Sequence, residues 1–365
     1  MQNINKRNYG IDILRMLSMY MVIILHIMGQ GGLLDKAVPG YNHYYRIWFF
    51  EIASYCAVNC YALVSGYVMV NSRFKLSNLA YLWLQVFFYS FGITFVYQLF
   101  ILNDINIVEL IKSALPVYKK SYWYFSSYFG MFFFIPMINN FVKSLNRKSA
   151  AFCIFLIFMM YSVCHTFAKT DIYNLNRGYS TLWLSLLYFT GACIKYHGVF
   201  EVNRKNHYLW LLVYIISIVI TFVSKVYLDS GKSVSIRKLY DANFLIKYTS
   251  PTIFISAIGL LLFFAGMEIN SGGTRNIINK LSPLSFSVYL IHVHPVLWRN
   301  YFKNSMIWCA DLPHGGFELT VLCIAVTIFI SCMVVDTLRK AIFDTFNIRD
   351  HLIYIEKQFE KMILE

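Results

Sequence analysis

The sequence is poor in charged residues, and poorest in acidic ones. Only 14% of its 365 residues are Asp, Glu, Lys or Arg, and Asp and Glu together number 18. A soluble globular domain carries about 25% charged residues, so this composition excludes an ordinary soluble protein. Proline is also scarce, at seven residues, and no stretch rich in Pro, Gly or Ser divides the chain. No internal repeat is visible, and we therefore expect one continuous domain.

Several motifs of soluble enzymes are missing as well. The sequence contains no glycine-rich phosphate loop, no Cys–His spacing typical of zinc and no nucleophile elbow, so we expect no metal. The eight cysteines fall almost entirely within apolar segments, where they resemble small hydrophobic residues rather than a disulfide framework. No cleavable signal peptide is apparent, because residues 1–10 lead into an apolar segment without a small-residue cleavage site.

Apolar and aromatic residues are abundant instead. Hydrophobic residues make up 58% of the chain and aromatic residues 18%, which is the composition of a polytopic membrane protein. Because a membrane-spanning helix needs about 20 apolar residues, the hydrophobic runs predict an all-α fold with about ten transmembrane helices. The predicted spans are residues 10–29, 47–70, 79–102, 121–141, 149–168, 180–197, 207–228, 249–267, 284–302 and 317–336.

Two parts of the chain follow from this pattern. The integral membrane domain is predicted to cover residues 1–336. The tail, residues 337–365, alternates charged and apolar residues at helical spacing. It is predicted to be a cytoplasmic amphipathic helix, which lies on the membrane or leads to a partner.

The chain is strongly basic, with 32 Lys and Arg residues and a net charge of +14. These residues do not form one stripe, so we expect no nucleic acid; basic loops that meet anionic lipid head groups explain the charge. Lys6 and Arg7 precede the first span, which favours a cytoplasmic N-terminus. We predict that both termini are cytoplasmic, because with ten spans four further basic clusters fall on that side. They are Arg73 with Lys75, Lys143 with Arg147 and Lys148, Arg204 with Lys205, and Arg339 with Lys340.

The first span carries three ionisable residues, Asp12, Arg15 and His26. Arg15 and His26 are eleven residues apart, about three helical turns, so they share one face and are separated by about 16 Å along the axis. Asp12 precedes Arg15 by three residues, close enough for an ion pair that lowers the cost of burying the guanidinium group. An ionisable residue within a membrane span indicates function, although Arg15 reaching the interface and His26 facing water is the alternative interpretation.

The two residue types suit the two ends of an elongated ligand. Arginine offers a planar, permanently charged fork for a phosphate group, and histidine transfers protons near neutral pH. A phosphate anchor near the cytoplasmic end and a base further across the membrane fit a coenzyme A thioester. The spacing of Arg15 and His26 therefore suggests an acyl-CoA donor such as acetyl-CoA.

These residues also carry a family resemblance. The pattern D-x-x-R-x10-H, formed by Asp12, Arg15 and His26, resembles the first helix of the membrane-bound acyltransferase 3 family. Three later stretches are similar to that family in the expected order: YALVSGYVM (61–69), YWYFSSYFGMFFFIPMI (122–138) and LSPLSFSVYLIHVHPV (281–296). The resemblance implies ten or more spans in a bacterial plasma membrane. It also implies transfer of an acyl group from cytosolic acyl-CoA to a sugar or peptidoglycan hydroxyl outside the cell.

The resemblance also assigns roles to residues. His26 is expected to be catalytic, either as a general base or as the site of a covalent acyl-histidine intermediate. The donor-binding residues are expected to be Arg15, Ser65, Arg73, Lys75 and Trp123, with Tyr289 and His292 at matching family positions. One stretch departs from the family, because residues 71–85 keep only Arg73 and Lys75 where many members carry an arginine cluster.

Glu51, in the second span, has two interpretations. It lies at roughly the predicted depth of His26, where a carboxylate fixes the histidine tautomer and stabilises the imidazolium ion. Alternatively, it is an interfacial residue paired with Arg46 or with solvent. His292 and His294 point to different faces of a helix, so a structural hydrogen bond is expected for each rather than a metal site. His294 precedes Pro295 and is expected to mark a kink.

Other functions remain open from the sequence. NYGIDILRM (8–16) and AVNCYALVSGY (57–67) are also similar to the membrane half of membrane-bound serine racemases, which belong to the same family. No racemase domain follows, so we expect a stand-alone acyltransferase or a truncated chain. A permease for serine or a lipid-linked sugar, or an accessory subunit of polysaccharide export, is the rival interpretation. The acceptor and the oligomeric state, including a homo-oligomer, are left open.

Overall fold

The structure is a computed structural model that describes residues 7–117, 122–168, 170–200, 202, 205–231 and 240–364. Over this part of the chain every regular element is a helix, which confirms the predicted all-α class. The α-helices of ten or more residues are α1 (Tyr9–Met28), α3 (Asn42–Ser54), α4 (Ala57–Met69), α5 (Leu76–Tyr97), α7 (Trp123–Phe132), α8 (Ile135–Ser144), α9 (Arg147–Ile157), α11 (Thr181–His197), α12 (His207–Asp229), α14 (Pro251–Ala265), α15 (Gly272–Leu281), α18 (Gly316–Thr345) and α19 (Ile348–Leu364).

Shorter helical pieces connect these elements. The short α-helices are α2 (Leu33–Lys36), α6 (Ile107–Ser113), α10 (His165–Phe167), α16 (Ser285–His292) and α17 (Pro295–Leu297). Three π-helical turns, Gln98–Leu102, Phe158–Cys164 and Trp298–Phe302, extend or follow longer helices. Three 3₁₀ turns cover Asn176–Gly178, Ser282–Leu284 and Ile307–Asp311.

The described helices make this a multi-pass membrane protein. Six helical segments are long and apolar enough to cross a bilayer, and the bent pair α7 and α8, with 56° between its halves, makes up to seven. All seven coincide with predicted spans. The other three predicted spans fall on α11, α14 and α16, which have 17, 15 and 8 residues. At about 1.5 Å per residue these are shorter than a hydrocarbon core of about 30 Å, so the number ten stays a prediction.

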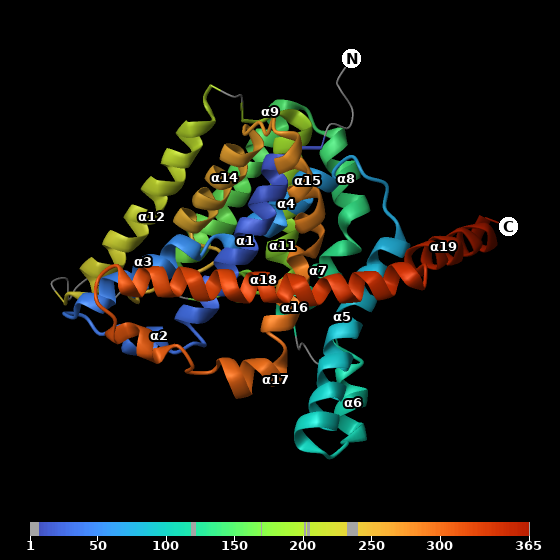
Figure 1. Cartoon of the computed structure of the whole chain (residues 1–365). Helices are drawn as coiled ribbons and strands as arrows, with labels where there is room; N and C mark the ends of the chain where they lie inside the picture. The colour runs from blue at the N-terminus through green and yellow to red at the C-terminus, as the bar shows by residue number, and fades with distance from the viewer. Residues whose placement is uncertain are drawn as a thin grey trace.

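Helix α1 lies at the centre of the bundle (Figure 1). It packs against α3, α4, α14, α16 and α18. Leu14, Ile23 and Ile27 on this helix have no exposed surface, as expected for a helix that is hydrophobic on nearly all sides. Figure 1 shows α18 crossing the front of the bundle, with α12 to one side and α5 and α8 to the other. Most of the helix that carries Arg15 and His26 is therefore buried within the bundle.

Two glycines allow α4 and α11 to approach closely. A Cβ atom at Gly66 would overlap the carbonyl oxygen of Tyr188, and one at Gly191 would overlap the carbonyl oxygen of Leu63. Small residues of this kind bring helix backbones together in membrane proteins. Gly66 is therefore required for packing.

The predicted span 284–302 is not one helix. Helix α16 ends at His292, and α17 begins at Pro295 after a break at Val293 and His294. Proline has no N–H group and disfavours a helical conformation of the preceding residue, and His294 is extended, with φ −54° and ψ 131°. The break turns the chain so that the π-helical turn from Trp298 returns to the end of α1.

Helix α18 continues to Thr345, nine residues beyond the end of the last predicted span at residue 336. Asp336 and Arg339 are buried within the helix bundle, at 0% and 3% exposure. Arg339 donates two hydrogen bonds to the Asp336 carboxylate, at 2.7 and 2.9 Å, and the Tyr89 hydroxyl adds a third at 2.6 Å. Pairing removes the cost of burying both charges, so the helix need not stop at Asp336.

The predicted tail helix is present as α19. It packs against α5, where the Ser77 hydroxyl donates a hydrogen bond to Glu356 at 2.6 Å. Exposed apolar side chains on α19 include Tyr354, Phe359 and Met362. Its contact with a membrane stays a prediction.

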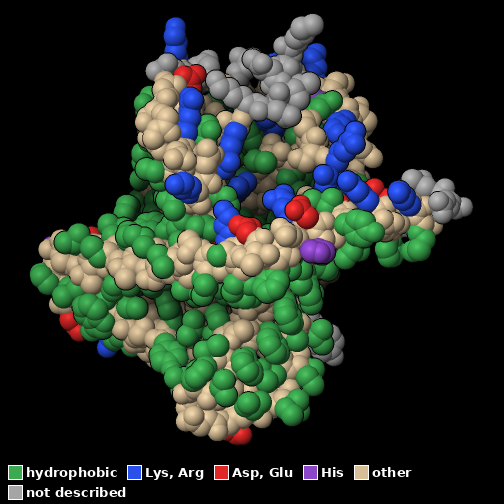
Figure 2. All heavy atoms as spheres, turned by 45° about the vertical axis from the view of Figure 1, so that its right-hand side comes forward, with side chains coloured by type: hydrophobic (Ala, Val, Ile, Leu, Met, Phe, Trp, Pro, Cys, Tyr) green, Lys and Arg blue, Asp and Glu red, His purple; other side chains and the backbone are tan. Residues whose placement is uncertain are grey.

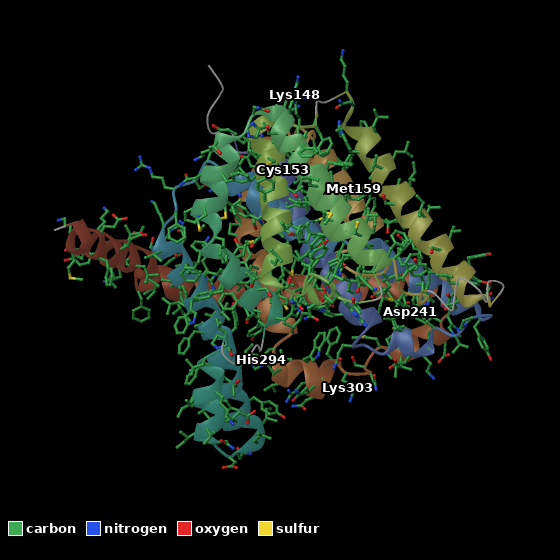
Figure 3. The ribbon with its side chains drawn as sticks, turned by 180° about the vertical axis from the view of Figure 1, so that it is seen from behind. Lys148, Cys153, Met159, Asp241, His294 and Lys303 are labelled. Carbon is green, nitrogen blue, oxygen red and sulfur yellow. The ribbon has the colours of Figure 1, made fainter. Side chains whose placement is uncertain are left out.

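Basic side chains gather over one end of the molecule (Figure 2). That end carries Lys148, at the beginning of α9, while Lys303 lies at the opposite end (Figure 3). Of the predicted basic clusters, Arg339 is buried in its ion pair and Arg204 lies outside the described residues. The placement of both termini in the cytoplasm stays a prediction.

The tight α4–α11 contact predicts the effect of one added methyl group. Gly66→Ala should destabilise the protein by about 1–3 kcal/mol, because the new Cβ meets backbone that cannot move aside. Gly92→Ala, where the Cβ meets nothing within 4 Å, is the matched control and should not lower the melting temperature. Thermal melts in detergent measure both, and equal melting temperatures would contradict this account of the packing.

Candidate active site

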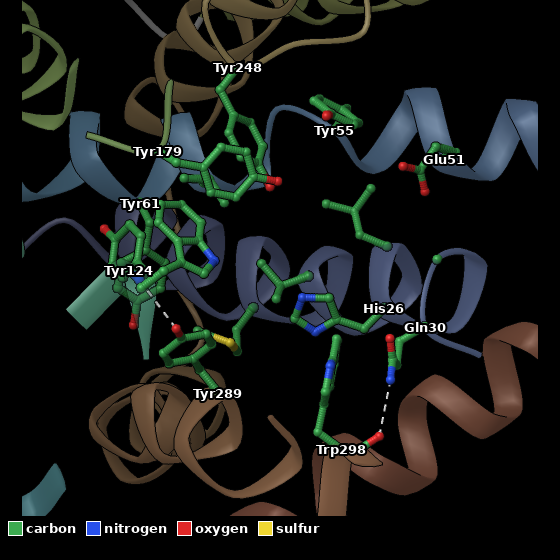
Figure 4. Close-up of a pocket in the computed structure, with 16 residues that line it drawn as sticks. His26, Gln30, Glu51, Tyr55, Tyr61, Tyr124, Tyr179, Tyr248, Tyr289 and Trp298 are labelled. Atoms are coloured by element: carbon green, nitrogen blue, oxygen red, sulfur yellow. Dashed lines mark hydrogen bonds between the residues drawn. The ribbon is translucent and has the colours of Figure 1, made fainter. Parts of the chain in front are cut away.

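A cavity of about 350 Å³ lies along α1 in the interior of the bundle (Figure 4). Its residues on α1 include Met19, Val22, His26 and Gly29, a spacing that places them on one face of the helix. The full lining is Met19, Val22, Leu25, His26, Gly29, Gln30, Glu51, Tyr55, Val58, Tyr61, Trp123, Tyr124, Tyr179, Tyr248, Tyr289 and Trp298. Sequence segments far apart in the chain thus converge on the His26 face of α1.

His26 is held by a second histidine. The Nδ1 atom of His26 and the Nε2 atom of His292 are 2.8 Å apart, and the Nδ1 atom of His292 is hydrogen-bonded to the carbonyl oxygen of Val288. Because a carbonyl only accepts, the proton of neutral His292 lies on Nδ1 and its Nε2 is an acceptor. His26 must then donate from Nδ1, which leaves its own Nε2 unprotonated. No hydrogen bond among the described residues occupies that atom.

The segment that contains Trp298 and Asn304 also holds the C-terminal end of α1 in place. The rings of Trp298 and His26 meet edge to face, with centroids 4.7 Å apart. The Gln30 side chain donates to the carbonyl oxygen of Trp298 at 3.2 Å, and the backbone N–H of Asn304 donates to the carbonyl oxygen of Gln30 at 2.9 Å. These contacts limit the rotation of the His26 ring, which preorganises it for one task.

Glu51 lies in the last turn of α3 and lines the same cavity, and its role stays a prediction. No hydrogen bond joins it to His26 in the described structure, where His292 takes the expected orienting role. Arg46 instead donates to the carbonyl oxygen of Leu312 at 3.2 Å and lies over the Phe317 ring at 4.9 Å. The Glu51 side chain is buried, at 7% exposure, and its Oε2 atom has no hydrogen-bond partner.

Aromatic side chains form one wall of the cavity (Figure 4). Ring centroids are 4.4 Å apart for Trp123 and Tyr179, 5.1 Å for Tyr179 and Tyr248, and 5.0 Å for Tyr55 and Tyr248. Burial raises the pKa of the Tyr179 and Tyr248 hydroxyls, so both are neutral at physiological pH. Of these residues the sequence singled out only Trp123, because aromatic residues are too frequent in this chain to mark a site.

The other end of α1 carries the predicted ion pair. A guanidinium nitrogen of Arg15 is 3.5 Å from Asp12, which confirms the pair. Asp12 also accepts from Arg7 Nε at 2.6 Å and from the Ser282 hydroxyl at 3.1 Å. Arg15 keeps 28% of its side chain exposed. It is one helical turn before Met19, where the cavity lining on α1 begins.

The remaining predicted site residues divide into two groups. Trp123 and Tyr289 line the cavity, and the Tyr289 hydroxyl accepts from the backbone N–H of Tyr124 at 3.3 Å. Ser65 lies outside the lining and donates to the carbonyl oxygen of Tyr61 at 3.0 Å. Arg73 and Lys75 are exposed in the turn between α4 and α5, also outside the lining. Their donor-binding roles stay predictions.

The fold and the site define a multi-pass membrane protein with a histidine in an enclosed, aromatic-lined cavity. Residues 8–336, nearly the whole chain, match the family described as Acyltransferase domain, acyltransferase 3. The chain belongs to this family, and the protein is a membrane acyltransferase. No curated protein and no solved structure gives a significant match. Among the described residues, no group of three or more His, Cys, Asp or Glu side chains is gathered as in a metal site.

The His26–His292 contact predicts a specific tautomer. Nitrogen-15 NMR of histidine-labelled protein in nanodiscs should show His26 with its proton on Nδ1 and a bare Nε2, because only that form donates to His292. In His292→Leu, which removes the acceptor, the His26 ring should become a mixture of tautomers. A proton on Nε2 of His26 in the unaltered protein would contradict this assignment.

Proposed function

We propose that the protein transfers an acyl group, an acetyl group in the simplest case, from cytoplasmic acyl-CoA to a hydroxyl of an extracytoplasmic glycan. His26 acts as the general base. The observation that carries the proposal is the free Nε2 atom of His26, which lines the cavity while its Nδ1 atom is bound to His292. A base with one nitrogen fixed and the other free is the arrangement that activates a hydroxyl nucleophile.

The reaction follows from this arrangement. Nε2 of His26 removes the proton of the acceptor hydroxyl as its oxygen attacks the thioester carbonyl carbon. The tetrahedral intermediate collapses, the carbon–sulfur bond breaks, and the imidazolium ion returns its proton to the leaving thiolate. His292 stabilises the imidazolium ion by accepting from its Nδ1–H, and the Val288 carbonyl oxygen holds His292 in the accepting orientation.

The donor enters at the end of the molecule where the basic side chains gather. Arg15 is partly exposed and lies about 16 Å along α1 from His26, so it can bind the coenzyme A phosphates while the thioester reaches the base. Asp12 holds the Arg15 guanidinium through one carboxylate oxygen and leaves other guanidinium nitrogens for a phosphate. Basic residues favour the cytoplasmic side, which places His26 towards the acceptor side of a plasma membrane.

Replacing His26 tests the proposal directly. Purified wild-type protein should slowly hydrolyse acetyl-CoA, with water in place of the acceptor, and release of the free thiol measures the rate. His26→Ala should lower that rate by about 10²–10⁴-fold, the usual contribution of a general base. It should keep the rise in melting temperature that coenzyme A produces, because the phosphate anchor is intact. Unchanged hydrolysis by a folded His26→Ala variant would refute the catalytic role.

In the same assay, replacing Arg15 should weaken donor binding rather than slow the chemical step. Arg15→Gln should raise the concentration of acetyl-CoA needed for half-maximal hydrolysis, while the maximal rate changes little. It should also reduce the rise in melting temperature that coenzyme A produces. Lys303→Gln, at the opposite end of the molecule, is the matched loss of one positive charge and should change neither quantity. Equal effects of the two variants would show that Arg15 acts only through net charge.

A further inference from the structure

Glu51 differs from the other buried charges of the described chain. Asp336 is paired with Arg339, and Asp229 is paired with Lys225 at 2.9 Å and accepts from the Tyr44 hydroxyl at 2.6 Å. Glu51 is 7% exposed, lines the cavity, and its Oε2 atom has no hydrogen-bond partner. An ionised carboxylate without a partner is costly in an apolar interior, so a cationic ligand that pairs with Glu51 would stabilise its charged form.

The surroundings of Glu51 define the charge of that ligand. Among the described residues of the lining, Glu51 is the one acidic side chain, and none is Lys or Arg. Tyr55 lies on the Glu51 side of the cavity, and Tyr179 and Tyr248 line the same space further along (Figure 4). Aromatic rings next to a carboxylate form the environment that attracts an ammonium group.

The donor does not fit this end of the cavity. Coenzyme A carries negatively charged phosphates, which a buried carboxylate repels, whereas Arg15 at the other end attracts them. The orientation of His26 does not require Glu51 either, because His292 occupies Nδ1. The acceptor is thus the ligand that meets Glu51.

We propose that the Glu51 end of the cavity is an ammonium subsite, so that the acceptor hydroxyl belongs to an amino alcohol such as a sugar with a free amine. This inference rests on the proposed function, because it places the acceptor between Glu51 and His26. An amine paired with Glu51 is protonated and cannot attack a thioester. The hydroxyl next to His26 is therefore acylated, and the product is an ester rather than an amide.

One basic residue lies near this subsite without occupying it. Arg177 lies in the 3₁₀ turn just before Tyr179, but its side chain is exposed to solvent and lies outside the lining. Its field is screened by water and salt, whereas the field of the buried Glu51 is not. The interior of the subsite therefore keeps its preference for a cation.

Two matched pairs of probes test the subsite independently of the natural acceptor. Choline and 3,3-dimethylbutan-1-ol have the same shape and differ in charge, and D-glucosamine and N-acetyl-D-glucosamine differ in the free amine. In wild-type protein the cationic member of at least one pair should bind at least tenfold more tightly than its neutral partner, by calorimetry or thermal shift. Glu51→Gln should abolish this preference, and Glu109→Gln, which alters an exposed carboxylate outside the lining, should retain it.

The contribution of the aromatic rings to cation binding is tested at Tyr179, on the rim of the cavity, where a substitution leaves the core intact. Tyr179 is 38% exposed. Tyr179→Phe should retain the binding of the cation, and Tyr179→Leu should weaken it about 2–5-fold, because only the first keeps a π face.

The outcomes separate this inference from the proposed function. Failure of both cations to bind wild-type protein, or equal preference in wild type and Glu51→Gln, overturns the ammonium subsite. The hydrolysis assay tests the role of His26 independently of the ammonium subsite, because water replaces the acceptor in that assay. Glu51→Gln should also keep the stabilisation by coenzyme A, which shows that the variant is folded.

Discussion

A charged side chain inside an apolar bundle must find a partner, and this constraint organises the structure. Arg15 and Asp12 pair at one end of α1, Asp336 and Arg339 pair within α18, and Lys225 and Asp229 pair within α12. Each pair makes a long hydrophobic helix compatible with a polar residue. Glu51 breaks the pattern, since it is buried beside the cavity with an unpartnered oxygen. In our proposal, this exception marks the part of the site that a ligand completes.

The site divides its tasks between two kinds of group. A neutral histidine and a backbone carbonyl orient His26, where many enzymes use a carboxylate. This leaves Glu51 on the opposite side of the cavity, free to select the acceptor. In the proposed mechanism, the Arg15 end binds the anionic phosphates of the donor and the Glu51 end binds a cationic acceptor, so that the two substrates meet at His26 from regions of opposite charge.

The sequence predicted the part of this arrangement that lies on one helix. The 3.6-residue period and the hydrophobic length fixed the shared face of Arg15 and His26 and the pairing of Asp12 with Arg15. The contact between His26 and His292 joins residues 266 positions apart, and no local period reports it. Tyr248 and Trp298 were missed because aromatic residues are common throughout the chain. The break before Pro295 was expected as a kink, whereas the continuation of α18 to Thr345 was not, because the burial of the Asp336–Arg339 pair depends on tertiary contacts.

The most direct test of the account is an experimental structure with coenzyme A bound. The central claim is that Arg15 and His26 contact the two ends of one acyl donor. The account predicts phosphate oxygens within hydrogen-bond distance of the Arg15 guanidinium group and the thiol sulfur in the cavity, beside the Nε2 atom of His26. A structure that places the thiol outside this cavity, or that shows densely packed protein between Arg15 and His26 with no path for the pantetheine arm, would contradict it.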